Sequence, residues 1–276
     1  MLRSFTTLEK DEIRSIAIGG FDGMHLAHQA LISKLDEKGA LLIIERNGVG
    51  LTPAKERCLY HDKPCVVLEF EKIKQMQPEA FVQFLQTAFV NLKKIVVGYD
   101  FFFGKDRRGD IALLKSTFRG EVEVVEEVHY EGISVHSRKI KALLLEGEIE
   151  KANMLLGRDY HIKGTVVPGQ GLGKKALYAT FNLSTGAFFL PREGVYASKV
   201  KVRGALYPSV TFIGTRVSTD QKFSIETHLL DEAFDAKVER VELYFVAYLR
   251  ENRKFDDLRD LKIQISQDID EAKAKL

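Results

Sequence analysis

The sequence predicts an α/β domain with a doubly wound parallel sheet, followed by a small antiparallel β-barrel that ends in a helix. Up to about residue 160, short apolar runs alternate with stretches of helical periodicity, the pattern of parallel strands joined by helices. Beyond that point the segments are β-rich and are separated by Gly, Pro and Asp turns. We therefore expect two domains, residues 1–158 and residues 159–276.

In the first domain, short apolar runs predict strands, and helical periodicity predicts the helices between them. The expected strands cover 16–20, 41–45, 65–70, 94–98 and 121–127. The expected helices cover 29–35, 78–85, 137–146 and 149–156. Pro78 suits the first turn of its helix, and Gly147 and Gly157 suit helix ends. In the second domain, strands are expected over 162–167, 194–202, 209–214, 223–230 and 237–249, with a helix over 258–274.

The composition excludes several classes of protein. The 276 residues carry 41 Lys and Arg against 39 Asp and Glu, a near balance that argues against a protein coating nucleic acid or an anionic membrane. No segment approaches the roughly 18 apolar residues of a membrane span, and the N-terminus lacks the apolar region of a secretory signal. Two cysteines, Cys58 and Cys65, are too few for a disulfide framework or a zinc site. We expect a reduced, cytoplasmic, globular protein.

The most informative local motif is Gly19-Gly-Phe-Asp-Gly-Met-His-Leu-Ala-His, between the first strand and the first helix. Glycines let a backbone approach a phosphate closely, and ligands bind at the carboxyl ends of parallel strands. His25 and His28 are three apart, so both imidazoles can face one phosphate. The spacing alone leaves open a glycine-rich turn with two incidental surface histidines.

This motif resembles the Gly-x-Phe-Asp-Gly-x-His-x-Gly-His signature of the nucleotidyltransferase superfamily, in its flavin adenylyltransferase branch. Ala27 replaces the usual glycine, and Gly20 stands where Asn is common. The resemblance implies a Rossmann-like fold, with His25 and His28 as catalytic residues. It also implies an ATP-binding loop formed by Gly19, Gly20, Phe21, Asp22 and Gly23.

The superfamily's second signature, a Ser-Ser-Thr-Arg segment that opens a helix, is similar to residues 133–140. The resemblance assigns Arg138 to the outgoing pyrophosphate and Ser137 to ATP, while Val135 and His136 replace serines. A guanidinium fork matches phosphate oxygens, although an arginine at this place, taken alone, is more often a solvated residue of a helix surface.

Residues 97–110 carry three consecutive phenylalanines, which cannot all face a core. The segment looks like the family's flavin-side loop, which implies flavin contacts at Asp100, Phe101, Phe103 and Gly104. Taken alone, such a cluster is also typical of a core. The family's Phe-Asp-Pro-His-Pro segment is absent, and Ile44-Glu-Arg-Asn-Gly-Val takes its place.

Residues 162–183 resemble the glycine-rich flap and the Gly-Phe-Pro-Thr-Ala-Asn motif of the riboflavin kinase module. Leu177, Ala179 and Phe181 depart from that motif, but the threonine and asparagine are kept. Thr180 and Asn182 are two apart on a strand, so their oxygens point the same way, which suits Mg²⁺ held with ATP phosphates. The resemblance adds Gly169, Gly171 and Gly173 as ATP-binding residues. A plain glycine-rich hairpin is the alternative.

With further matches, the resemblance covers residues Ile16 to Ala272. Over this length the chain resembles the bacterial bifunctional riboflavin kinase/FAD synthetase family. These matches place Glu226 as the kinase's general base, Phe212 where Asn is usual, and Arg250 and Phe255 in the tail that covers flavin. The resemblance implies phosphorylation of riboflavin to FMN, then adenylylation of FMN to FAD, with Mg²⁺ accompanying ATP and no nucleic-acid or membrane partner. Because the departures lie within the motifs, a monofunctional enzyme and a non-catalytic flavin-binding regulatory protein stay open as alternatives.

Overall fold

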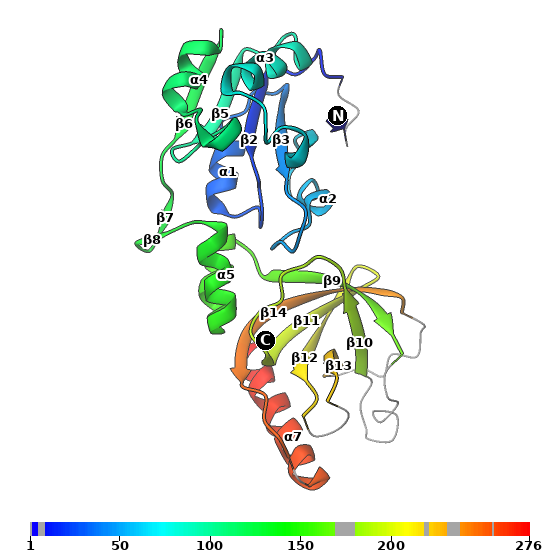
Figure 1. Cartoon of the computed structure of the whole chain (residues 1–276). Coiled ribbons are helices and arrows are strands. Elements are labelled where there is room, and N and C mark those ends of the chain that lie inside the picture. The colour runs from blue at the N-terminus through cyan, green and yellow to red at the C-terminus, as the bar shows by residue number, and fades with distance from the viewer. Residues whose placement is uncertain (1, 5–8, 169–179, 218–220, 231–237, 256) are drawn as a thin grey trace. The chain divides into compact units, whose positions relative to one another are not determined.

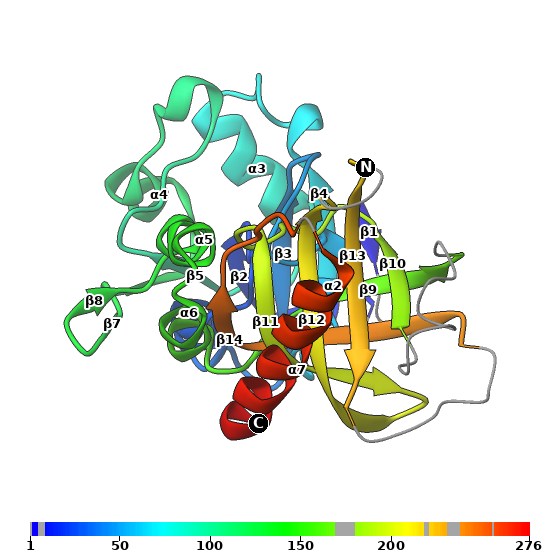
Figure 2. The same cartoon turned by 90° about the horizontal axis from the view of Figure 1, so that it is seen from below.

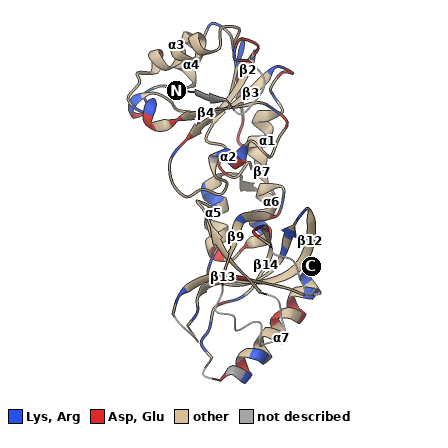
Figure 3. Ribbon diagram, turned by 90° about the vertical axis from the view of Figure 1, so that its right-hand side faces the viewer, with Lys and Arg blue, Asp and Glu red and all other residues tan. Residues whose placement is uncertain are grey.

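The computed structural model describes residues 2–4, 9–168, 180–217, 221–230, 238–255 and 257–276. The chain packs into two compact units, Met1–Ser137 and Arg138–Leu276 (Figure 1). Among the described residues, no helix is long and apolar enough to cross a membrane. Lys and Arg positions are interspersed with Asp and Glu positions along the ribbon of both units (Figure 3), which agrees with the near balance of charge.

The first unit contains a six-stranded sheet in the order β1-β4-β3-β2-β5-β6. Strands β2 to β6 are parallel, and β1 pairs antiparallel with β4 at the edge. The strands are β1 (Leu2–Ser4), β2 (Ser15–Gly19), β3 (Gly39–Glu45), β4 (Cys65–Glu69), β5 (Lys94–Gly98) and β6 (Glu121–Val125). A small hairpin of β7 (His129–Tyr130) and β8 (Ile133–Ser134) follows. The parallel sheet predicted from the sequence is confirmed.

The helices of this unit cover both faces of the sheet. They are α1 (Leu26–Ile32), α2 (Ala54–Arg57), α3 (Pro78–Ala88) and α4 (Ile111–Thr117), with short 3-10 turns at Phe70–Lys72 and Lys105–Arg107. Ile16 and Ile18 of β2 pack in one apolar cluster with Phe81 of α3. Ala17, between them, packs in a second cluster with Leu31 of α1. Alternate side chains of a strand point to opposite faces, so β2 is buried on both sides.

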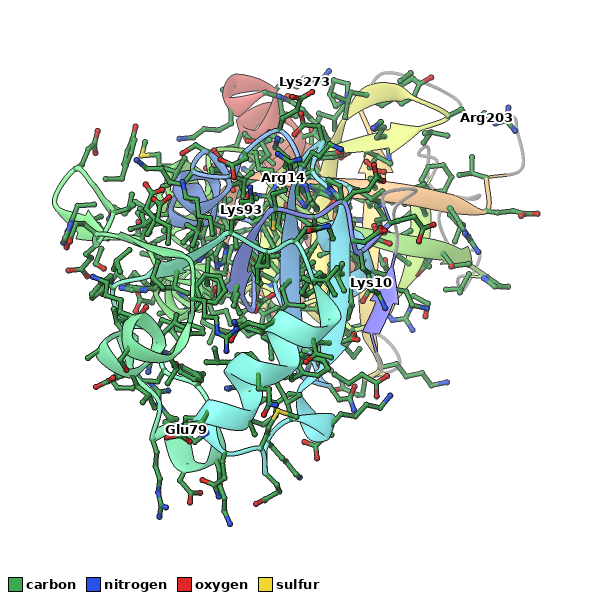
Figure 4. All side chains as sticks on the ribbon, turned by 90° about the horizontal axis from the view of Figure 1, so that it is seen from above. Lys10, Arg14, Glu79, Lys93, Arg203 and Lys273 are labelled. Atoms are coloured by element: carbon green, nitrogen blue, oxygen red, sulfur yellow. The ribbon has the colours of Figure 1, made fainter. Side chains whose placement is uncertain are left out.

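Strands β2 and β5 are the point at which the winding of the sheet reverses. At their amino ends, the backbone N–H of Lys93 donates to the carbonyl of Arg14 at 2.7 Å, and both residues are labelled in Figure 4. At their carboxyl ends, the chain leaves β2 after Gly19 and β5 after Gly98. Ligands of open α/β sheets bind outside the carboxyl ends at such a point. The two predicted motifs at 19–28 and 97–110 therefore begin on neighbouring strands.

The second unit contains a closed barrel in the order β10-β13-β12-β11-β14-β9. Its strands are antiparallel: β9 (Tyr160–Val167), β10 (Thr180–Thr185), β11 (Gly194–Val202), β12 (Ala205–Thr215), β13 (Phe223–Leu229) and β14 (Arg240–Arg250). Arg203, labelled in Figure 4, has a positive φ of 49° in the two-residue turn between β11 and β12. The antiparallel barrel predicted from the sequence is confirmed.

Three helices accompany the barrel: α5 (Ser137–Glu146), whose first residue belongs to the first unit, α6 (Ile149–Leu156) and α7 (Leu258–Lys275). Helix α7 lies against β11, β12 and β14 (Figure 2). The small side chains of Ala197, Ala247 and Ala272 meet at this contact. Small residues allow a helix to approach a sheet closely, so this seam fixes the place of the C-terminal helix.

The wall of the barrel carries a row of buried hydroxyl groups. Ser198, Ser209, Thr211 and Thr227 have no exposed surface. Their side chains are joined by hydrogen bonds of 2.7–2.8 Å across β11, β12 and β13. Because buried hydroxyls are costly without partners, this continuous row lets polar residues occupy the interior.

Candidate functional site

The glycine-rich motif lies in the loop between β2 and α1. His25 is the residue that precedes the first turn of α1, and Phe21 and Met24 are buried in the apolar cluster beneath the loop. Phe21 and Met24 have positive φ angles of 53° and 46°, and Gly23 has 91°. The loop is therefore an irregular backbone with its apolar side chains pointing inward. In this loop Gly20 is exposed, and Gly19 and Asp22 are half-buried.

The two predicted histidines lie against each other. The imidazole rings of His25 and His28 stack with centroids 3.6 Å apart and planes inclined by 19°. His25 is 4% exposed, and its Nε2 lies 3.2 Å from the hydroxyl of Ser137, a residue 112 positions away. That hydroxyl donates to the backbone carbonyl of Asp22 at 2.7 Å. The first motif and Ser137 of the second therefore meet.

The residues that depart from the second signature have structural contacts of their own. Val135 is 1% exposed, so it is part of the core. His136 Nε2 lies 3.2 Å from the hydroxyl of Tyr99 and 3.4 Å from a carboxylate oxygen of Glu127. Arg138 is exposed in the first turn of α5.

The carboxylate of Glu127 is the centre of a small polar cluster that the sequence analysis did not identify. The hydroxyl of Ser134 donates to it at 2.5 Å, and His129 Nε2 lies 3.6 Å from its second oxygen. Hydrogen bonds from Ser134, Tyr99 and His136 lower the pKa of Glu127, because they stabilise its charged form. This cluster joins the carboxyl end of β5 to the residues that lead into α5.

The phenylalanine loop divides its side chains between the core and the surface. Phe103 is 6% exposed, and its ring stacks on Phe101 with centroids 5.6 Å apart. Phe102 is 49% exposed, and the guanidinium of Arg107 lies 4.9 Å from the centre of its ring. The sequence required at least one exposed phenylalanine, and the structure shows that it is Phe102. Asp100 is exposed and Gly104, with a φ of 72°, packs against Pro78.

The kinase residues come together through strand register. Asn182 of β10 pairs directly with Glu226 of β13, and Glu226 pairs on its other side with Phe212 of β12. Ile225 and Thr227, the neighbours of Glu226 along the strand, are buried, so Glu226 points to the outer face of the barrel. Thr180 shares that face with Asn182, since the two are two residues apart.

A further arginine holds the predicted general base. Nη1 of Arg216 donates to Oε1 of Glu226 at 3.0 Å, and the two side chains are 17% and 29% exposed. The sequence analysis did not single out Arg216, because it follows β12 and reaches Glu226 only when β12 and β13 pair. This ion pair orients the carboxylate beside Asn182.

The oxygen atoms on this face suit a hard cation. Thr180 offers a hydroxyl and Asn182 an amide carbonyl, and Mg²⁺ bound to a nucleotide needs only one or two protein ligands besides phosphate and water. The described residues contain no group of three or more His, Cys, Asp or Glu side chains that could hold a metal by themselves. The donor set therefore fits a magnesium ion brought with ATP.

Other predicted residues lie elsewhere. Gly169, Gly171 and Gly173 fall outside the described residues, as do Leu177 and Ala179. Arg250 is committed to helix α7, because its Nε and Nη2 each donate to the carboxylate of the buried Asp268 at 2.7 Å. Phe255 is half-buried, with the guanidinium of Arg253 4.6 Å from its ring centre.

Two family models match separate parts of the chain. Residues 55–139 match the FAD synthetase model, and residues 156–276 match the riboflavin kinase model. The first match includes Asp100 and Ser137, and the second includes Asn182 and Glu226. The flavin-side loop, Ser137 and the kinase residues thus lie within family matches of the corresponding name, whereas the motif at 19–28 precedes the FAD synthetase match.

Curated relatives match nearly the whole length. The bifunctional riboflavin kinase/FMN adenylyltransferase of Listeria monocytogenes is 30% identical, covering 98% of this chain and 95% of the relative. Its counterpart from Pseudomonas fluorescens is 29% identical over 93% of this chain and 91% of the relative. A crystal structure named as a macrolide-efflux protein from Streptococcus pneumoniae superposes with a TM-score of 0.83 at 25% identity, over 95% of this chain and 94% of that one. The chain belongs to the bifunctional riboflavin kinase/FMN adenylyltransferase family.

Proposed function

We propose that this enzyme makes FAD from riboflavin in two ATP-dependent steps, with one step in each domain. The proposal assigns FMN adenylylation to residues 1–158 and riboflavin phosphorylation to residues 159–276. The observation that carries it is that one chain contains both family domains, each with its motif side chains assembled: His25 against Ser137, and Glu226 against Asn182.

In the kinase step, Glu226 accepts the proton of the 5′-hydroxyl of riboflavin as that oxygen attacks the γ-phosphorus of ATP. The bond from phosphorus to the β,γ-bridging oxygen breaks, so the products are FMN and ADP. Arg216 holds one carboxylate oxygen of Glu226, which fixes the direction of the other. Thr180 and Asn182 would hold Mg²⁺, whose charge neutralises the triphosphate. Positioning supplies most of the acceleration in phosphoryl transfer.

In the adenylyl step, a phosphate oxygen of FMN attacks the α-phosphorus of ATP, and pyrophosphate leaves. The attacking phosphate is already ionised, so no protein base is required. His25 and His28 would stabilise the charge that develops on the α-phosphate, and Ser137 holds His25 in place. Arg138 would bind the leaving pyrophosphate. We assign the isoalloxazine ring to the loop that carries Asp100, Phe101, Phe103 and Gly104.

The substrates and products of this scheme are riboflavin, FMN, FAD and ATP. We propose a cytoplasmic enzyme with no nucleic-acid partner, because its charge is nearly balanced and ATP sites need only local basic residues. We also propose that Gly169, Gly171 and Gly173 contact the ATP phosphates of the kinase site.

The test is a reaction of the purified protein with riboflavin, Mg²⁺ and ATP, followed by chromatography of the flavins. We expect FMN to appear first and FAD to follow. FMN without FAD would overturn the bifunctional assignment and leave a monofunctional kinase. Conversion of added FMN to FAD without use of riboflavin would leave a monofunctional adenylyltransferase. Flavin binding without any product would identify a regulatory flavin-binding protein.

A further inference from the structure

The loop that bears the catalytic histidines is held in a backbone conformation that its residues do not favour. Phe21 and Met24 both have positive φ angles, a conformation in which the Cβ atom of a non-glycine residue comes too close to the following carbonyl oxygen. Such a conformation persists only where the surrounding structure determines it. Burial of both side chains accounts for part of the support, with Phe21 0% and Met24 2% exposed.

A buried arginine supplies further support. Arg57 lies at the end of α2 and is 6% exposed. Its Nη1 donates to the carbonyl oxygen of Gly20 at 2.5 Å, and its Nη2 lies 3.6 Å from Oδ1 of Asp22. One guanidinium therefore holds the residues on both sides of Phe21. Burial lowers the pKa of Arg57 and the charge of Asp22 opposes that shift, so the half-buried carboxylate stabilises the buried guanidinium.

The segment around Arg57 is shaped to receive Asp22. The backbone N–H of Thr52 donates to Oδ1 of Asp22 at 3.1 Å, and the carbonyl of Thr52 accepts from Nε of Arg57 at 2.8 Å. A Cβ atom on Gly50 would lie 2.7 Å from the same carboxylate oxygen, so a side chain there would have to displace the carboxylate of Asp22. The segment 50–57 follows residues 44–49, which stand where the family's Phe-Asp-Pro-His-Pro segment is missing.

The contacts continue from Asp22 to the reacting centre. The carbonyl of Asp22 accepts the hydroxyl hydrogen of Ser137, and Ser137 contacts His25. A displacement of Asp22 would therefore move Ser137 or break its bond to the loop, and either change alters the direction of His25. A misplacement of about 1 Å at a reacting group can lower a rate by about a hundredfold.

We infer that Arg57 is a positioning residue for adenylyl transfer, which holds the Gly20–Asp22 backbone so that Ser137 and His25 face the α-phosphate of ATP. This inference rests on the proposed adenylyltransferase function of the loop. An arginine is required because its fork reaches a carbonyl and a carboxylate at once, whereas a lysine presents one ammonium group. Lysine should restore the charge but only part of the geometry.

The experiment measures FAD formation from FMN and ATP by Arg57→Met, Arg57→Lys and Gly50→Ala. Lys55→Met is the matched control, because Lys55 is an exposed cation on the same helix. We expect kcat of Arg57→Met to fall about a hundredfold with KM for FMN unchanged, since the flavin loop is built from other residues. The kcat values of Arg57→Lys and Gly50→Ala should lie between those of Arg57→Met and the wild type. The kcat of Lys55→Met should equal that of the wild type.

Addition of millimolar guanidinium ion separates positioning from folding. The ion can fill the site vacated in Arg57→Met, so FAD formation should recover in part, and an equal concentration of sodium chloride should have no such effect. Wild-type kcat in Arg57→Met would overturn the inference. Arg57 would be purely structural if kcat fell equally in Arg57→Met and Arg57→Lys, guanidinium ion restored no activity, and the thermal transition of the first unit were lost. Failure of the wild type and Lys55→Met to form FAD would instead overturn the adenylyltransferase function, and with it the inference.

Discussion

The two candidate sites are built by opposite means. At the barrel, Asn182, Glu226 and Phe212 are adjacent because three regular strands pair in one register. At the parallel sheet, His25 is held by Ser137, and its loop by Arg57, side chains that arrive from distant parts of the sequence. A regular sheet face needs no special support, whereas an irregular loop with left-handed residues does. We therefore expect a substitution on the barrel face to remove a reacting group without moving its neighbours. A substitution behind the loop should instead displace the loop that carries His25.

The largest effect is expected for Glu226→Gln. Glutamine keeps the size of the side chain but cannot accept the riboflavin proton, so formation of FMN should fall about 10²–10⁴-fold. Conversion of FMN to FAD by the same preparation should persist. Glu239→Gln, at an exposed carboxylate that precedes β14, is the control and should phosphorylate riboflavin normally. Unchanged FMN formation in Glu226→Gln would show that another group takes the proton.

A smaller effect, on stability, is expected for Arg250→Met. The change removes both hydrogen bonds from Arg250 to the carboxylate of Asp268, which is 3% exposed. Because a buried charge without its ion-pair partner is costly, the free energy of unfolding should fall by about 3 kcal/mol. Urea unfolding measures the loss, and the double variant Arg250→Met/Asp268→Leu should recover most of it. If stability is unchanged while riboflavin binding is lost, Arg250 contacts flavin rather than supporting α7.

The smallest effect is a pH dependence from His161. Burial, with help from the charge of Arg158, lowers the pKa of this imidazole from 6.5 to about 4 in the folded barrel, and Glu242 opposes the shift. Below pH 6.5 the unfolded chain therefore binds a proton that the folded chain does not, so stability falls as the pH drops and levels off below about 4. Between pH 7.5 and 5.5 we expect a loss of about 1 kcal/mol in the free energy of unfolding. His161→Gln should remove this slope, and an equal slope in the variant would assign it to other groups.

Much of the fold was predictable because local signals agree with the tertiary structure. Helices α5 and α6 begin and end where periodicity and Gly147 and Gly157 place them. Helix α4 was not predicted, although Asp110 caps it by accepting from the N–H of Leu113 at 2.8 Å. Strand β1 and helix α2 are too short to show a periodic pattern.

The site was predictable only where residue types alone carry the information. His25, Ser137, Asn182 and Glu226 lie in motifs, and the structure brings them together in pairs. Arg57 and Arg216 were not predicted as site residues, because their partners are set by burial and strand pairing. The sequence did not explain why Val135 and His136 replace serines. In the structure Val135 packs in the core and His136 contacts Tyr99.

If two separate sites act in turn on one flavin, two variants that each lack one activity should complement each other when they are mixed. Glu226→Gln should make FMN only at its strongly reduced rate, and His25→Ala should convert riboflavin to FMN and stop there. A mixture of the two variants with riboflavin, Mg²⁺ and ATP should form FAD after a lag, because FMN made by one molecule is adenylylated by the other. A mixture that forms no FAD, while each variant retains its remaining activity, would contradict the account.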